Sequence, residues 1–169
     1  MTPPLFLRAI EETSLSSWIR DSQSLFGYWF ILTIHALGMG TLVGASTVLD
    51  LRLLGVAKDL PIAPLKRIYP IMWIGFWMHV VSGGLLMYAF PTKALTNPVF
   101  YTKLFLIGVA MVMMLRLNTR VFGESSLTDD EGMMRNGRSL AKWSLICWAA
   151  AMTAGRLLAY TAKYLVYPG

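Results

Sequence analysis

Two long stretches without charged residues constrain this chain more than any other feature of its sequence. Residues 22–49 and 68–92 contain no Asp, Glu, Lys or Arg over 28 and 25 positions respectively. A helix needs about 20 predominantly apolar residues to cross the hydrocarbon core of a bilayer. Each stretch therefore predicts a membrane-spanning helix, and we expect the chain to be an integral membrane protein.

The composition extends this prediction to the whole chain of 169 residues. Hydrophobic residues make up 56% of the chain and charged residues 14%, whereas soluble domains contain roughly 45–50% and 25%. Hydropathy and charge predict spans at about residues 25–49, 68–90, 99–116 and 140–167, which leaves no length for a separate soluble catalytic domain. We expect an all-α fold in which residues 1–169 form one transmembrane domain, an antiparallel four-helix bundle.

The basic residues predict an orientation rather than a nucleic-acid surface. The net charge is +6, and nine Lys and Arg residues fall in the two connections on one side of the bundle: Arg52, Lys58, Lys66, Arg67, Arg116, Arg120, Arg135, Arg138 and Lys142. Short loops rich in Lys and Arg stay on the cytoplasmic side. Both chain termini are therefore expected on the opposite side. No run of basic residues interleaved with aromatics indicates nucleic acid as a partner.

Two polar segments lie outside the predicted spans. Residues 5–19 carry apolar side chains at spacings of three and four, which is typical of an amphipathic helix lying in the membrane interface. Residues 118–139 are predicted to form the inner loop, with all of their acidic residues at 124–131. We expect this loop to be disordered or to contact a partner protein.

Three ionisable residues stand out inside the predicted spans, because burying such groups in a bilayer costs free energy. They are His35, His79 and Arg156. His35 lies ten residues from Leu25, and His79 lies eleven residues from Phe90. At ~1.5 Å per residue both histidines are about 15–16 Å deep. Consecutive antiparallel helices therefore bring the two imidazoles to the same level.

Two facing imidazoles suit the two axial positions of a haem iron better than a catalytic zinc site, which needs three protein ligands. A flat macrocycle approaches a helix only where the side chains are small. Gly38, Gly75 and Gly83 lie within four residues of His35 or His79. These residues predict a haem b bound between His35 and His79, with both histidines as metal ligands.

Arg156 is expected to hold the propionates of this haem. It lies eleven residues from the outer end of the predicted fourth span, which is similar in depth to the histidines. Tyr160 and Lys163 continue its helix face outward at i+4 and i+7. The same stripe suits the head group of a quinone. Lys103, one turn inside the third span, is expected to extend outward to the membrane surface.

Other interpretations of these residues remain open. Glycines at four-residue spacing also allow close helix packing in lipid, and Arg156 suits a contact with another subunit. Soft Cu(I) ligands are available in Met111, Met113, Met114 and Cys147, although successive helical positions do not share a face. On these interpretations the chain is an accessory subunit of a larger complex, or it transports copper or protons.

Several segments resemble a family of uncharacterised small bacterial inner-membrane proteins with four helices. The similarity is carried by residues 34–56 (IHALGMGTLVGASTVLDLRLLGV), 73–76 (WIGF), 82–88 (SGGLLMY) and 97–106 (NPVFYTKLFL). More distantly, the chain is similar to the membrane domain of copper-resistance D-type proteins, which also has a histidine in its first helix. The resemblance implies a bacterial inner-membrane protein with four helices. With the orientation given above, both termini are then periplasmic.

The leading hypothesis is a b-type cytochrome that transfers electrons between a quinone and a partner protein. Haem supplies the redox chemistry, and the protein sets the potential through the ligands and their burial. We expect other membrane or periplasmic subunits, or further copies of this chain, as partners. An electron-transfer or accessory subunit is favoured over a stand-alone enzyme.

Overall fold

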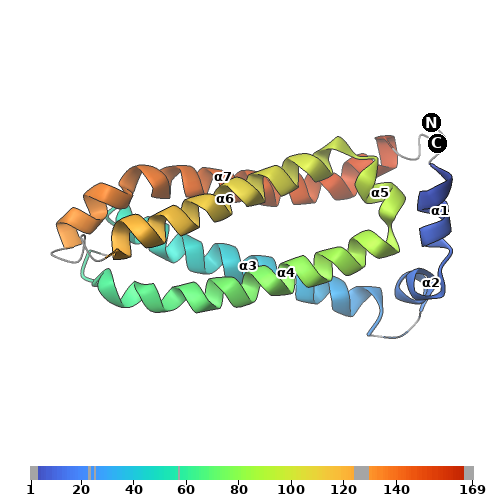
Figure 1. The fold of residues 1–169 in the computed structure, drawn as a ribbon, viewed down its shortest axis with the longest axis horizontal. Coiled ribbons are helices and arrows are strands. Elements are labelled where there is room, and N and C mark those ends of the chain that lie inside the picture. The colour runs from blue at the N-terminus through green and yellow to red at the C-terminus, as the bar shows by residue number, and fades with distance from the viewer. Residues whose placement is uncertain (1–3, 23, 25, 57, 124–129, 166–169) are drawn as a thin grey trace.

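The computed structural model describes residues 4–22, 24, 26–56, 58–123 and 130–165. All the regular structure within these residues is helical (Figure 1). In chain order the elements are α1 (Leu5–Glu11), α2 (Ser14–Asp21), α3 (Tyr28–Leu53), the 3₁₀ helix η1 (Ala63–Ile68), α4 (Tyr69–Ala89), α5 (Pro91–Leu95), α6 (Pro98–Phe122) and α7 (Asp130–Leu165).

Three helical stretches are long and apolar enough to cross a membrane. They are Tyr28–Leu53, Ala63–Ala89 and Pro98–Phe122, and they coincide with the first three predicted spans. The prediction of an all-helical chain with membrane-spanning helices is therefore supported. The fourth long helix, α7, is less apolar because its first turns carry acidic and basic residues.

Local sequence signals explain where several helices begin and end. Proline occupies the first position of α5 and of α6, where its missing N–H costs no helical hydrogen bond. The Asn97 side chain accepts a hydrogen bond from the backbone N–H of Val99 (3.0 Å) and so caps α6. After α3, Gly55 has a φ of +96°, a left-handed conformation that favours glycine. The chain can therefore turn sharply at this point.

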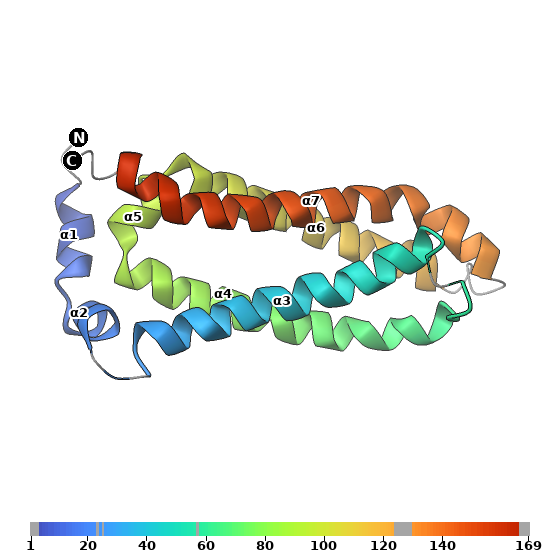
Figure 2. The ribbon, with the colours of Figure 1, turned by 180° about the vertical axis from the view of Figure 1, so that it is seen from behind.

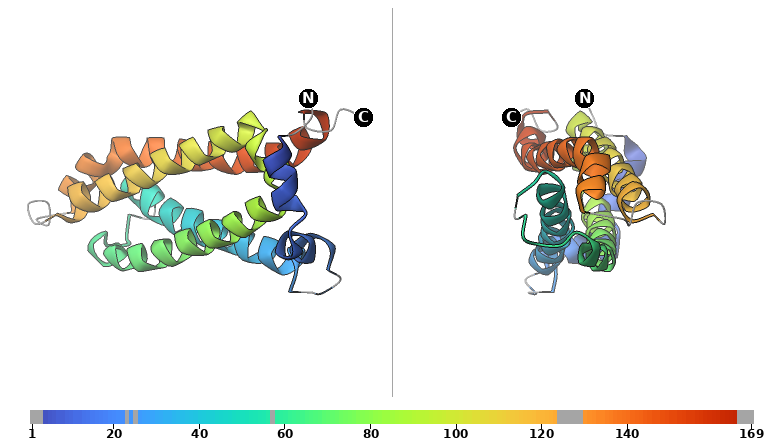
Figure 3. Two further views of the ribbon diagram at one scale, coloured as in Figure 1. Left: turned by 45° about the vertical axis from the view of Figure 1, so that its right-hand side comes forward. Right: turned by 90° about the vertical axis from the view of Figure 1, so that its left-hand side faces the viewer.

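The four long helices form two hairpins that pack on one another. Helix α3 pairs with α4, α6 pairs with α7, and α3 also packs along α7 (Figures 1 and 2). The right-hand view of Figure 3 looks along these helices from the end opposite the chain termini. The main hydrophobic core lies in the half of the bundle near η1, and includes Leu49, Met72, Met114 and Trp148. Helices α1, α2 and α5 lie across the opposite end, here named the α5 end (Figure 1).

The N-terminal segment forms two short helices, whereas the sequence predicts one amphipathic helix. Thr13 separates them, because its Oγ1 accepts the backbone N–H of Ser16 (3.4 Å) at the start of α2. Thr13 Oγ1 also lies 3.0 Å from the Tyr88 hydroxyl. The Glu11 carboxylate accepts the backbone N–H of Thr92 (3.2 Å). These contacts fix the segment across the α5 end.

The predicted inner loop is largely helical. Helix α6 continues to Phe122 and α7 begins at Asp130, so most of the stretch over residues 118–139 extends these two helices. Residues 124–129, which contain part of the acidic segment, lie outside the described residues. The loop prediction is wrong for the rest because charged residues end the membrane-embedded part of a helix without ending the helix itself.

Helices α3 and α4 touch where Gly38 faces Gly75. A Cβ atom on Gly38 would lie 2.9 Å from the backbone oxygen of Gly75 and 2.7 Å from the backbone nitrogen of His79. A Cβ atom on Gly75 would lie 2.8 Å from the backbone nitrogen of Leu42. Neither position has room for a side chain, so the two backbones are in direct contact, as small residues allow in lipid.

Replacing Gly75 by leucine is expected to destabilise the protein, because the new side chain forces α3 and α4 apart. Overpacking of this kind costs roughly 1–3 kcal/mol, and thermal unfolding in detergent followed by circular dichroism measures the loss. Gly40→Leu is the matched control, since a Cβ atom at Gly40 meets no atom within 4 Å. Equal unfolding temperatures for the two variants would contradict the close contact.

Candidate functional site

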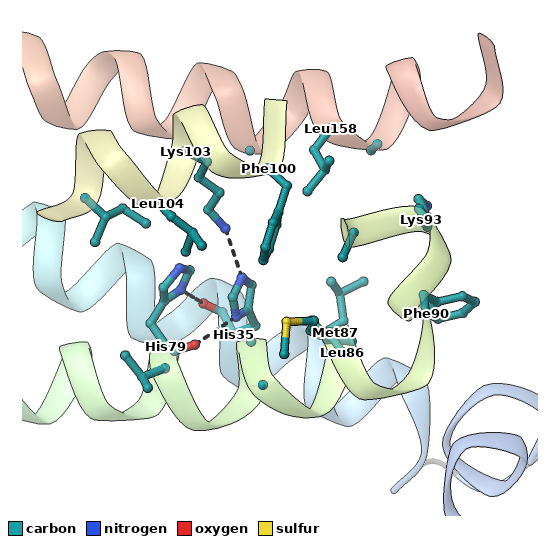
Figure 4. A pocket seen from close by; sticks show the side chains of 18 of the residues that line it. His35, His79, Leu86, Met87, Phe90, Lys93, Phe100, Lys103, Leu104 and Leu158 are labelled. Atoms are coloured by element: carbon teal, nitrogen blue, oxygen red, sulfur yellow. Dashed lines mark hydrogen bonds between the residues drawn. The ribbon is translucent and has the colours of Figure 1, made fainter. Parts of the chain in front are cut away.

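The two hairpins diverge toward the α5 end (Figure 1). Between them lies a cavity of about 380 Å³ (Figure 4). Most of its wall is apolar, and every long helix contributes to it. The lining residues are Tyr28, Leu32, His35, Phe76, His79, Val80, Gly83, Gly84, Leu86, Met87, Phe90, Lys93, Ala94, Phe100, Lys103, Leu104, Ile107, Gly155, Leu158 and Ala159.

Two histidines form part of the cavity wall on the α3–α4 side (Figure 4). The Nδ1 atom of His35 lies 3.2 Å from the backbone oxygen of His79, and Nδ1 of His79 lies 3.0 Å from the backbone oxygen of His35. The rings stack with 3.8 Å between their centroids and 25° between their planes. The prediction that the two imidazoles meet at one level is confirmed.

The reciprocal hydrogen bonds set the orientation of both rings. A carbonyl oxygen only accepts hydrogen bonds, so Nδ1 is the donor in each ring. The other ring nitrogen, Nε2, then carries a lone pair when the imidazole is neutral. Because the Nδ1 edges of His35 and His79 face the two backbones, the Nε2 edges face the cavity that both rings line (Figure 4).

Lys103 of α6 completes this group, although the sequence did not predict it as a site residue. Its Nζ atom lies 3.4 Å from Nε2 of His35 (Figure 4). Its side chain runs past Gly155, where a Cβ atom would lie 3.7 Å from the Cε atom of Lys103. The prediction that Lys103 extends outward is wrong, because α6 directs this side chain into the cavity. The sequence feature that could have indicated this role was the position of a lysine inside a predicted membrane span.

The stripe predicted on α7 is not part of the cavity wall. Arg156 and Tyr160 are exposed, and the side chain of Lys163 lies outside the described residues. On this helix Gly155 and Leu158 line the cavity instead. Successive helical residues point about 100° apart, so a cavity that faces Gly155 does not face Arg156. The structure therefore does not bring Arg156 or Tyr160 to the histidines.

The three predicted glycines have two different positions. Gly83 lines the cavity, and a Cβ atom there would lie 3.0 Å from Cε1 of His35. Glycine at this position leaves room for the imidazole. Gly38 and Gly75 do not line the cavity and form the contact between α3 and α4. This arrangement matches the alternative interpretation of these two glycines as helix-packing residues.

The stacked histidines do not fit a haem whose iron is bound by both of them. Two axial ligands approach the iron from opposite faces of the macrocycle, so the macrocycle must lie between the rings. His35 and His79 instead lie face to face with their centroids 3.8 Å apart. Haem b bound between them stays a prediction that requires the two rings to separate.

The copper interpretation rests on three methionines and one cysteine, which the structure places in or against the main hydrophobic core. In the part of the chain that the structure describes, no three His, Cys, Asp or Glu side chains lie close enough together to hold a metal ion. Met111, Met114 and Cys147 are buried in the main hydrophobic core, and Met113 packs against it. These four residues act as packing residues in this structure.

The cavity carries positive charge, and none of its lining residues is acidic. Lys93 lies near the α5 end with its Nζ atom 5.9 Å from the centre of the Phe90 ring, whereas Lys103 points into the cavity toward His35. A cavity with apolar walls and a few convergent polar groups is typical of a small-molecule site. Its charge suits a ligand whose polar atoms accept hydrogen bonds.

A second polar cluster lies outside this cavity, near the other end of α3. The Ser46 hydroxyl donates a hydrogen bond to Oδ2 of Asp50 (3.3 Å) and accepts one from Nε1 of Trp148 (3.0 Å). Asp50 is completely buried. The cluster connects α3 with α7 and stabilises the packing of the two hairpins.

Comparisons with known proteins leave the site itself as the basis for inferring function. The chain matches no family model, and no characterised protein or solved structure is significantly similar to it. The resemblance described under Sequence analysis stays a prediction.

Adding haem to the purified protein in mild detergent is expected to give no bis-histidine spectrum, because the stacked rings do not occupy opposite faces of one macrocycle. The reduced-minus-oxidised difference spectrum measures this, with His35→Ala and His79→Ala as controls. A Soret band and an α band that are lost in both variants would show that the rings separate around a haem.

Proposed function

We propose that this chain is a bacterial inner-membrane protein that binds the head group of a quinone between Lys103 and the two histidines. The observation that carries the proposal is the convergence of three nitrogen-bearing side chains, Lys103, His35 and His79, in a cavity whose wall is mostly apolar. A quinone has an apolar ring with polar oxygen atoms on its edge. This distribution of polar and apolar atoms matches the distribution in the cavity wall.

The three side chains complement both redox forms of a quinone. A quinone carbonyl oxygen accepts hydrogen bonds, and the Lys103 ammonium donates them. A quinol hydroxyl donates a hydrogen bond, and the lone pair on Nε2 of His79 accepts one, since the lone pair of His35 faces the Lys103 ammonium. The site can therefore hold the oxidised and the reduced ligand, as an electron-transfer subunit requires.

We assign α7 as a fourth membrane span, which makes the protein a four-helix transmembrane bundle. Its length of 36 residues exceeds the roughly 20 residues that a bilayer requires. Its N-terminal part carries Arg135, Arg138 and Lys142 and lies at the same end as the connection between α3 and α4 (Figure 1). The excess of basic residues there favours a cytoplasmic position for this end. The α5 end and both termini are then periplasmic.

Electron transfer from a quinol needs an acceptor, which we assign to a partner subunit or to a second copy of this chain. An exposed face of small residues on α3, formed by Ala36, Gly40 and Gly44, supports this assignment. A Cβ atom at Gly40 or Gly44 would meet no atom within 4 Å. Faces of this kind let helices of neighbouring subunits approach closely in lipid.

Lys103→Met is expected to weaken quinone binding, because methionine keeps most of the side-chain length but removes the hydrogen-bond donor. Loss of a hydrogen bond from a charged group costs roughly 1.5–3 kcal/mol, which corresponds to an increase in Kd of about 10- to 100-fold. Calorimetric titration of a short-chain benzoquinone into the protein in lipid nanodiscs measures this Kd.

Lys142→Met is the matched control, since Lys142 is exposed on α7 and does not line the cavity. An unchanged Kd for Lys103→Met, or the same increase in both variants, would contradict the role given to Lys103. Wild-type protein that binds no quinone would contradict the proposed function as a whole.

A further inference from the structure

The cavity wall between α4 and α6 is open, and its apolar residues are exposed. On this side three lining side chains are also surface residues: Val80 is 42% exposed, Met87 36% and Leu104 50%. Met87 and Leu104 come from α4 and α6 respectively and both lie in the cavity wall (Figure 4). These residues therefore contact the cavity and the surroundings of the protein at the same time.

The other side of the cavity, between α3 and α7, is more closed. Of the residues of these two helices that line the cavity, only Ala159 is exposed, and the others are partly buried. The α5 end is covered by α1, α2 and α5 (Figure 1). The side between α4 and α6 is therefore the main route by which a ligand can reach Lys103.

A glycine keeps this opening free. Gly84 lines the cavity and is exposed, and a Cβ atom there would meet no atom within 4 Å. The neighbouring Gly83 differs, because a Cβ atom there would contact His35. The imidazole of His35 fills the space beside Gly83, whereas no atom of the protein fills the space beside Gly84.

The opening lies along two helices that are apolar enough to cross a membrane, so acyl chains of lipids surround it rather than water. The cavity volume of about 380 Å³ is near the lower end of the roughly 300–1,000 Å³ of pockets for drug-sized ligands. A head group with a long hydrocarbon tail does not fit inside completely. Its tail has to leave through the wall.

From these observations we infer that the ligand is a long-tailed amphiphile that enters sideways from the bilayer between α4 and α6, and whose tail stays in this opening. The inference rests on the proposed function for the identity of the head group. The tail remains among the lipid chains, so only the head group has to move from the lipid into the cavity. The site thus recognises the head through Lys103 and admits the tail through the gap at Gly84.

Gly84→Trp is expected to close the opening and to discriminate between two probes, a benzoquinone with a decyl tail and the same head group without a tail. In nanodiscs the Kd for the tailed probe should rise by roughly tenfold or more, which corresponds to about 1.4 kcal/mol. The Kd for the probe without a tail should change little. Ile146→Trp is the control, since Ile146 is exposed on α7 and lies outside the cavity wall.

Leu104→Trp closes the same opening from α6 and serves as the second variant should Gly84→Trp fail to fold. An equal loss of affinity for both probes in the folded variant, or an unchanged affinity for the tailed probe, would overturn the proposal of lateral entry. Wild-type protein that binds neither probe would instead show that the proposed quinone function fails, and the two failures are therefore distinguishable.

Discussion

The direct contact between α3 and α4 at Gly38 and Gly75 is the constraint on which the site depends. With no side chain between the two backbones, each histidine reaches the backbone oxygen of the other, at 3.0 and 3.2 Å. A carbonyl oxygen has two lone pairs, so a helical carbonyl can accept this additional hydrogen bond without losing its bond within the helix. The same contact therefore packs the helices and orients the imidazoles.

Buried polar groups in a membrane are costly unless they find partners, and most of those described here have one. The Nδ1 atoms of His35 and His79 bond to backbone oxygens, and Asp50 accepts a hydrogen bond from Ser46. The groups that face the cavity differ, because the Lys103 ammonium has Nε2 of His35 as its neighbour (3.4 Å) and apolar walls around it. A ligand with oxygen atoms would supply the acceptors that this ammonium lacks. In the cavity this free hydrogen-bonding capacity lies beside the two imidazoles, which is why we assign the binding site there.

The sequence predicted the features that follow from charge and from helix rise. The ends of the first three spans are marked by charged residues, and the equal depth of His35 and His79 follows from counting residues along antiparallel helices. Charge positions and residue counts do not determine how far each helix is rotated about its own axis. Lys103 was therefore expected at the surface, and Arg156 was expected beside the histidines, whereas packing against neighbouring helices sets both orientations. Gly38 and Gly75 lie within four residues of a histidine, which is compatible with either a bound macrocycle or a contact between helices. In the structure the two glycines lie opposite one another, which shows that they form the helix contact.

Binding of a quinone head group beside the two imidazoles is tested most directly by solid-state NMR in lipid bilayers. The chain has only two histidines, so labelling histidine nitrogen marks this site alone. With the quinone labelled at its carbonyl carbons, dipolar transfer is expected between those carbons and the imidazole nitrogens of His35 and His79. Absence of this transfer at saturating quinone would contradict the proposed site.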